Sequence, residues 1–278
     1  MGSDEEFEQT RNRLFDDMRD ELLKIVRVDA LTVDAQLLAI ILADTPGDAC
    51  RGDLMKLEAT TADYLQQSVP GFDMEAPHYW ANKVLTDGVT AADLTVSEPA
   101  LIGWLHTLEA ISQLCMASAR YRAAANYSRR VLKAEGYPTR ATGTVLLALA
   151  RLEDEDGFFA LAHQLEEQMG ADTLENSPWY LLARTILLFK TNKMRPATRA
   201  LREFANRCEG GAFFLLNPMY QTPSLPCRPE PHDPWDLSHQ AVWEADGIIS
   251  DTPDFAPWAS ACEDVSQLAQ EFARRYGF

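Results

Sequence analysis

The sequence lacks the short motifs that mark the commonest catalytic sites. It contains no G-x-S-x-G, no Walker A loop, no G-x-G-x-x-G and no H-E-x-x-H. The usual nucleophile, phosphate, dinucleotide and zinc sites therefore have no support in the sequence. We expect a protein that is not an enzyme and that needs no cofactor.

Basic residues, long apolar runs and paired cysteines are also scarce. The chain has 25 Lys and Arg against 42 Asp and Glu, which disfavours nucleic acid or an anionic membrane as the main partner. No apolar run approaches the roughly 20 residues needed to span a bilayer, and the opening MGSDEEFEQ has no signal-peptide pattern. The five cysteines show no paired spacing, so free thiols are expected. These deficits favour a cytoplasmic protein.

What the sequence does contain is a two-helix unit that recurs between Trp104 and Cys208. Each unit has a small residue in the middle of its second helix and a larger apolar residue three positions earlier: Ala124 with Tyr121, Ala162 with Phe159, and Ala197 with Met194. A small residue is needed where paired helices cross closely, and the larger side chain is expected to fill the gap beside it. The spacing is close to the roughly 34-residue period of tetratricopeptide arrays.

The first helices of these units have clear boundaries in the sequence. Residues 141–152 and 178–189 are apolar on most of their circumference, as expected of helices packed on two sides. Ser177 followed by Pro178 predicts a helix start, and Gly170 predicts a left-handed helix end. The fold class is therefore predicted as all-α, a right-handed α-α superhelix of tetratricopeptide-like helical pairs.

The flanks of the repeats predict further helices and one extended segment. Residues 5–26 have the pattern of an amphipathic opening helix with a solvated outer face. Six prolines between Pro218 and Pro234 predict an extended strap, since proline breaks a helix. Asp233 is expected to cap the helix that follows, and a last helix from about Trp258 is expected to close the array.

These predictions define one α-solenoid domain over residues 1–278. Degenerate helices occupy 1–98, the clear repeats occupy 99–210, and the strap and capping helices occupy 211–278.

The order of these pieces resembles the bacterial tetratricopeptide proteins related to the suppressor of tumorigenicity 7 family. The matching features are, in order, His78-Tyr79-Trp80, the proline-led helix at Pro99, the repeats, the run Phe213–Pro218, the proline-rich strap, and an acidic helix followed by Pro253, Pro257 and Trp258. The resemblance implies an all-helical superhelix with no established catalytic residues.

Such a superhelix would bind a protein or peptide partner in its concave groove. Alignment on the small residues of the first helices places Gln113, Arg151 and Arg184 at equivalent groove-facing positions, with Tyr180 nearby. Arginine binds carboxylates in a bidentate manner, so the groove would suit an acidic or C-terminal segment. The alternative is that both arginines pair with acidic residues of adjacent helices, such as Glu153 or Asp154.

Two other functions remain open. His232, Asp236 and His239 are residue types that ligate metals, so a metal-dependent hydrolase or other enzyme using the His232 to His239 region is one alternative. The second alternative is a self-associating structural protein, a homo-oligomer in which the locally basic repeats dock onto an acidic end of another copy. We expect no metal site if the protein is a scaffold or a self-associating protein.

Overall fold

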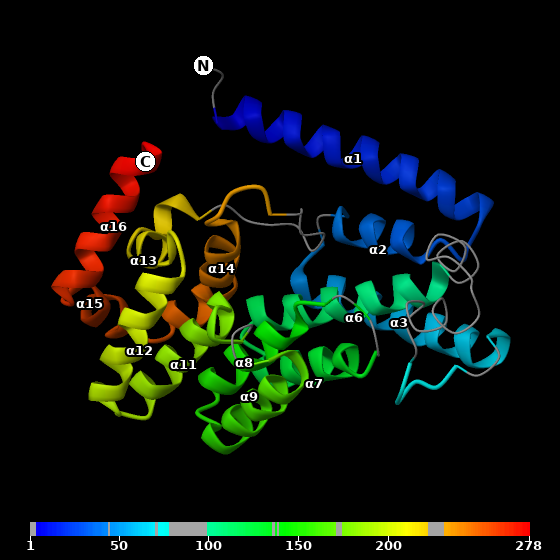
Figure 1. The fold of residues 1–278 in the computed structure, drawn as a ribbon. Coiled ribbons are helices and arrows are strands. Elements are labelled where there is room, and N and C mark those ends of the chain that lie inside the picture. Colours follow the sequence, from blue (N-terminus) through cyan, green and yellow to red (C-terminus); the bar gives the residue numbers. More distant parts are fainter. Residues whose placement is uncertain are drawn as a thin grey trace. The chain divides into compact units, whose positions relative to one another are not determined.

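The computed structural model shows an assembly of helices (Figure 1). It describes residues 4–43, 45–69, 72–77, 99–134, 137, 139–170, 174–221 and 231–278. Within these ranges every regular element is a helix and no strand occurs, so the all-α prediction is confirmed.

The chain forms two compact units. The first comprises Met1–Leu114 and Tyr127–Thr139, and the second comprises Cys115–Asn126 and Arg140–Phe278. Up to residue 139 the helices are α1 Asp4–Val28, α2 Val33–Ile41, α3 Gly47–Ser68, α6 Pro99–Ala117 and α7 Tyr121–Leu132. From residue 140 onward they are α8 Ala141–Arg151, α9 Glu155–Met169, α11 Pro178–Lys190, α12 Met194–Arg207, α13 Gly211–Leu216, the 3₁₀ turn η1 Pro218–Tyr220, α14 Asp236–Ser250, α15 Phe255–Ser260 and α16 Glu263–Tyr276. This grouping differs from the three-part division expected from the sequence, which remains a prediction.

Helix α11 begins where its sequence predicts. Pro178 is its first residue, and the Ser177 side chain accepts a hydrogen bond from the backbone N–H of Tyr180 at 3.5 Å. Gly170 ends α9 with a φ of +85°, a value that suits glycine because it has no Cβ. Its ψ of 146° differs from the left-handed helical geometry expected there. The start of α11 and the glycine end of α9 are thus confirmed, and the left-handed form of that end is not.

The small residues in the second helices are buried, as predicted: Ala124, Ala162 and Ala197. The larger residues ahead of them behave differently from one another. Tyr121 is buried, but Phe159 is 43% exposed and Met194 is 36% exposed. In α9 the buried ring belongs to Phe158, which stacks on Tyr180 at 5.9 Å. The gap-filling role predicted for Phe159 and Met194 is therefore wrong, because the apolar face of α9 lies one residue away and Met194 is the first residue of α12.

A tryptophan joins three helices in the first unit. Trp104 of α6 is fully buried, and its indole N–H donates to Glu58 Oε1 of α3 at 2.9 Å. Arg130 of α7 donates to the same oxygen at 2.6 Å, and its guanidinium lies 5.6 Å from the Trp104 ring centre. Because one carboxylate oxygen serves both donors, α3, α6 and α7 are held in a fixed register.

Helix α1 packs against α2 through only part of its apolar surface. Phe15, Leu22 and Val26 are half-buried. The remaining apolar side chains of the predicted stripe stay exposed, and they are Phe7, Leu14, Met18 and Ile25. The expected solvated outer face is confirmed, because the described polar side chains of α1, Arg19 apart, are exposed, but the apolar surface of α1 is wider than α2 covers.

The C-terminal helices enclose an aromatic cluster. Phe213 and Phe214 of α13 contact Phe272 of α16 at ring distances of 5.2 and 5.7 Å. The predicted last helix is broken in two, because Cys262 has an extended backbone between α15 and α16. Glu263 and Asp264 occupy the first turn of α16, where negative charge stabilises a new helix start.

Three sequence features lie outside the described residues, wholly or in part. They are the His78-Tyr79-Trp80 stretch, Gly136, which like Gly170 is expected from the sequence to end a helix in a left-handed conformation, and residues 222–230 of the predicted strap.

Candidate functional site on α8, α11 and α14

Helix α14 lies against α8 and α11, the first helices of two predicted repeats (Figure 1). It runs parallel to α8, because hydrogen bonds join residues that are each 100 apart: Arg140 to Gln240, Thr144 to Glu244, and Arg151 to Asp251. The constant offset keeps one face of α8 opposite one face of α14 for about three turns. The chain's own helix therefore covers the face of α8 that carries Arg151.

Glu244 is the polar centre of this helix contact. Its side chain belongs to a residue that is only 8% exposed. Its Oε2 accepts a hydrogen bond from Trp179 Nε1 of α11 at 2.8 Å, and its Oε1 accepts one from the Thr144 hydroxyl of α8. A buried carboxylate is unfavourable unless donors satisfy it. The two donors consequently fix the depth and register of α14 on both helices.

Apolar packing holds the same stretch of α14 in place. Four of its side chains are at most 1% exposed: Ala241, Val242, Ala245 and Ile248. Full burial of a valine or isoleucine side chain stabilises a fold by about 1.5–3 kcal/mol. The middle of α14 is therefore a permanent part of the core of the second unit.

The C-terminal end of α14 is bound less tightly. Asp251 follows the last residue of the helix, and its side chain is 47% exposed. Arg151 Nη2 donates to Asp251 Oδ2 at 3.3 Å, and the Tyr121 hydroxyl donates to the same oxygen at 3.4 Å. Both distances are longer than usual for such bonds, which are near 2.8 Å when one partner is charged.

Arg151 is nevertheless held firmly in its own position. Its guanidinium lies 5.3 Å from the centre of the Tyr121 ring, within the range of a cation–π contact. Among the described residues its Nε is buried and has no hydrogen-bond partner. Burial, reinforced by the charge of Asp251, raises the pKa of Tyr121, so the phenol keeps its proton at neutral pH. The site thus combines a positioned arginine with a neutral hydroxyl beside it.

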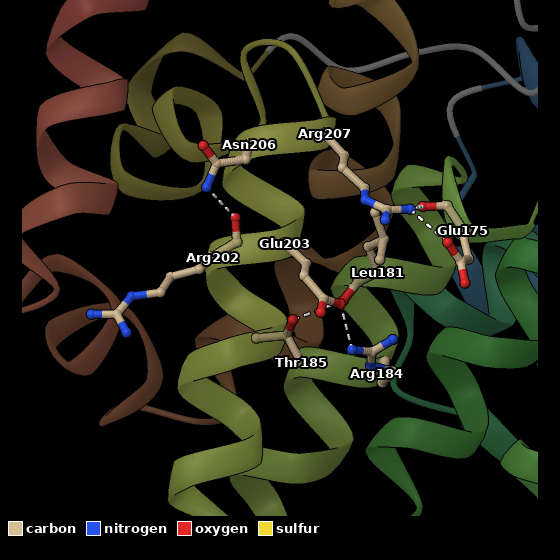
Figure 2. Close-up of polar contacts among 8 residues, drawn as sticks. All are labelled: Glu175, Leu181, Arg184, Thr185, Arg202, Glu203, Asn206 and Arg207. Carbon is tan, nitrogen blue, oxygen red and sulfur yellow. Dashed lines mark hydrogen bonds and ion pairs between the residues drawn. The ribbon is translucent and has the colours of Figure 1, made fainter. Parts of the chain in front are cut away.

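The other predicted groove residues lie elsewhere in the second unit or in the first. Figure 2 shows Arg184 reaching Glu203 of α12, with Nη2 to Oε2 at 2.5 Å. The Arg184 guanidinium lies 5.8 Å from the ring centre of Tyr180, a ring that also stacks on Phe158 of α9. Arg151 and Arg184 therefore contact different helices, and the structure does not bring them together. Gln113 belongs to the first unit.

Both arginines have acidic partners, but not those that the sequence suggested. Glu153 pairs with Lys190 at 3.2 Å. Asp154 caps α9 by accepting a hydrogen bond from the backbone N–H of Gly157 at 2.9 Å. Glu153 and Asp154 therefore already have partners close to their own loop. Arg151 pairs with Asp251 instead, and Arg184 pairs with Glu203.

The metal candidates have structural roles. Asp236 Oδ2 accepts hydrogen bonds from the backbone N–H groups of His232 at 2.7 Å and Asp233 at 3.0 Å. The cap predicted for Asp233 is therefore wrong: α14 begins two residues beyond Pro234, where Asp236 satisfies these donors. His239 is buried against Phe214, and burial lowers its pKa. No group of three or more metal-ligating side chains occurs in the described ranges.

Seven basic residues in the described part of the repeats form ion pairs within their own units. Ion pairs join Arg130 with Glu58, Lys133 with Glu75, Arg184 with Glu203, Lys190 with Glu153, Lys193 with Glu155, Arg202 with Asp264, and Arg207 with Glu175. Figure 2 shows the Arg207 pair beside that of Arg184. The acidic partners neutralise much of the basic surface that self-association through the repeats would need.

No disulfide joins the described cysteines, and burial raises their pKa where a shift is resolved. Cys208 is the extreme case, with its pKa raised to about 12. Burial also raises the pKa of Cys50 and of Cys262. A raised pKa leaves little thiolate at neutral pH, which is unfavourable for a nucleophile or a redox site.

Sequence reasoning did not identify Tyr121, Glu244 or Asp251 as site residues. Tyr121 has a packing role in the repeat pattern, which hides its hydroxyl. Glu244 and Asp251 belong to an acidic helix whose docking place no local pattern specifies. Only a comparison of α8 with α14 at an offset of 100 residues would have revealed the facing polar positions.

Comparisons of the chain with protein-family models, curated proteins and solved structures gave no match. Within the described part of the chain, no helix combines the length and the apolar character needed to cross a membrane.

Proposed function

We propose that the protein is a non-enzymatic interaction scaffold that binds a carboxylate of a protein or peptide partner at Arg151 and Tyr121. The observation that carries the proposal is the weak engagement of Arg151, which holds the half-exposed Asp251 by one bond of 3.3 Å. A guanidinium binds a carboxylate best through two parallel hydrogen bonds. A partner carboxylate in the place of Asp251 could form two such bonds with the Nη1 and Nη2 groups.

Asp251 acts in this proposal as an internal occupant that gives way to the partner. Its carboxylate stands just beyond the C-terminus of α14, where the helix dipole disfavours negative charge. Its side chain is half-exposed, and the packed residues of α14 end at Ile248. Asp251 can therefore leave Arg151 without undocking the helix.

The same proposal includes the finer architecture. Helices α8 with α9, and α11 with α12, form consecutive packed pairs, and α8 packs against α11. This order supports a tetratricopeptide-like superhelix of the kind found in relatives of the suppressor of tumorigenicity 7 family. Unpaired cysteines support work in a reducing compartment such as the cytoplasm. No contact in the described residues favours the hydrolase alternative over this scaffold.

The change that tests the proposal is Arg151→Ala. A fluorescent peptide rich in Asp and Glu, with a free C-terminal carboxylate, should bind this variant about 10- to 100-fold more weakly than it binds the wild type, because a charge-assisted hydrogen-bond pair is lost. Fluorescence anisotropy gives the affinity, and circular dichroism checks the fold.

The matched control is Arg184→Ala, which also removes a guanidinium from a tyrosine ring but on the side of α12. This variant should bind the peptide as the wild type does. Equal losses for both variants, or no binding of the peptide by the wild type, would show that Arg151 is not the receptor.

A further inference from the structure

The exposed apolar side chains of α1 follow a heptad spacing. The exposed residues are Phe7, at 71%, together with Leu14, Met18, Ile25 and Val28. With positions 11 and 21 added, the series advances alternately by four and by three residues. This alternation over about three heptads is the pattern of a coiled-coil seam.

The seam is distinct from the surface that α1 uses within its own unit. The face toward α2 carries Phe15, Leu22 and Val26, all half-buried, and Arg19, whose Nε donates to the carbonyl oxygen of Ala39 at 3.2 Å. On the helical wheel the centre of this face lies roughly a third of a turn from the centre of the seam. Contact with α2 therefore leaves the seam open.

Two seam positions hold charges of opposite sign, Arg11 and Glu21. In an antiparallel pair of identical helices, the residue numbers rise along one helix and fall along the other. The numbers of two facing residues therefore add up to the same sum along the whole pair. With the sum set at 32, Phe7 faces Ile25, Leu14 faces Met18, and Arg11 faces Glu21. The two charges then meet each other, and every apolar seam position except Val28, which falls opposite position 4, meets an apolar position.

We infer that α1 is a homodimerisation helix that pairs in antiparallel orientation with α1 of a second copy of this chain. A parallel pair would instead put Arg11 on Arg11 and Glu21 on Glu21, and like charges across an interface are unfavourable. Charge complementarity thus selects both the partner and its direction.

A charge-reversal cycle tests the inference in the full chain. Sedimentation equilibrium should show a wild-type dimer with a dissociation constant on the order of micromolar. Arg11→Glu should weaken the dimer at least about 10-fold, because two Glu–Glu contacts replace two ion pairs, and Glu21→Arg should weaken it similarly. The double variant Arg11→Glu with Glu21→Arg should restore the wild-type value, since opposite charges again face each other.

Arg13→Glu is the control, because Arg13 is exposed on α1 but lies off the seam. It makes the same charge change and should leave the dimer unaffected. All three substituted positions are exposed, so circular dichroism should show native helicity in every variant. A monomeric wild type at the highest concentration reached, equal effects of Arg11→Glu and Arg13→Glu, or failure of the double variant to recover would each overturn the inference.

Discussion

Replacing Phe214 by alanine should lower the free energy of unfolding of the second unit by about 4 kcal/mol. The ring is 1% exposed and contacts Phe213, Trp235 and Phe272 at centre distances of 5.3 to 5.7 Å, with His239 closer at 4.7 Å. The cost is high because Phe214 joins α13 to both α14 and α16. Neighbouring rings on three helices cannot all move into the space left behind, so a cavity remains.

Urea denaturation followed by circular dichroism measures this loss, with Phe159→Ala as the matched control. Phe159 is also a phenylalanine in a helix, but it is 43% exposed, so its removal should cost about 1 kcal/mol. Similar losses at the two positions would show that the aromatic cluster does not form the core around α13.

Replacing Gly143 by alanine should lower stability by about 2–3 kcal/mol, although alanine is the better helix former by about 0.5–1 kcal/mol. A Cβ at Gly143 would lie 2.9 Å from Trp179 Cβ and closer still to the indole ring. The indole cannot turn away freely, because its N–H donates to Glu244 at 2.8 Å. The added methyl therefore forces α8 and α11 apart or breaks the bond to α14.

Gly247→Ala in α14 separates this packing effect from helix propensity. A Cβ there would meet only the Tyr121 hydroxyl, at the ordinary contact distance of 3.8 Å. The change should therefore stabilise the protein by a few tenths to about 1 kcal/mol. Thermal melting of the two variants should give shifts of opposite sign, and a stabilising Gly143→Ala would refute the close approach of α8 to Trp179.

Local chemistry explains which parts of the fold could be predicted from the sequence. Ser177 and Pro178 act on the backbone groups of their own helix, so the start of α11 needed no knowledge of its neighbours. The buried Ala124, Ala162 and Ala197 follow from the repeat spacing in the same way. Phe159 was assigned one residue out of phase, because Phe158 and Phe159 are adjacent and only the tertiary contact with Tyr180 distinguishes them.

The candidate site could be predicted only in part, because it depends on a long-range pairing. The sequence predicts Arg151 as a groove-facing residue of a first helix, which remains a prediction, and it gives no sign of Asp251, the neighbour 100 residues away. Helix α14 covers α8 and α11 because Glu244 accepts hydrogen bonds from both Trp179 and Thr144. No periodic pattern in the sequence predicts this interaction. The two arginines have different surroundings for the same reason. Arg151 pairs with Asp251 at the end of α14, whereas Arg184 pairs with Glu203 of α12.

The central claim is that a partner carboxylate replaces Asp251 at Arg151, and the affinity of the acidic free-carboxylate peptide for the Asp251→Asn variant tests it most directly. Asparagine keeps the size of the side chain but removes the competing charge. The account predicts binding about 10-fold tighter than to the wild type, because the receptor is no longer partly occupied.

Asp246→Asn makes the same charge change elsewhere on α14 and controls for the general repulsion between the acidic chain and the peptide. The account predicts that its affinity stays at the wild-type value while that of Asp251→Asn rises. Equal affinities for the wild type and Asp251→Asn, or equal gains for the two variants, would contradict the exchange of carboxylates at Arg151.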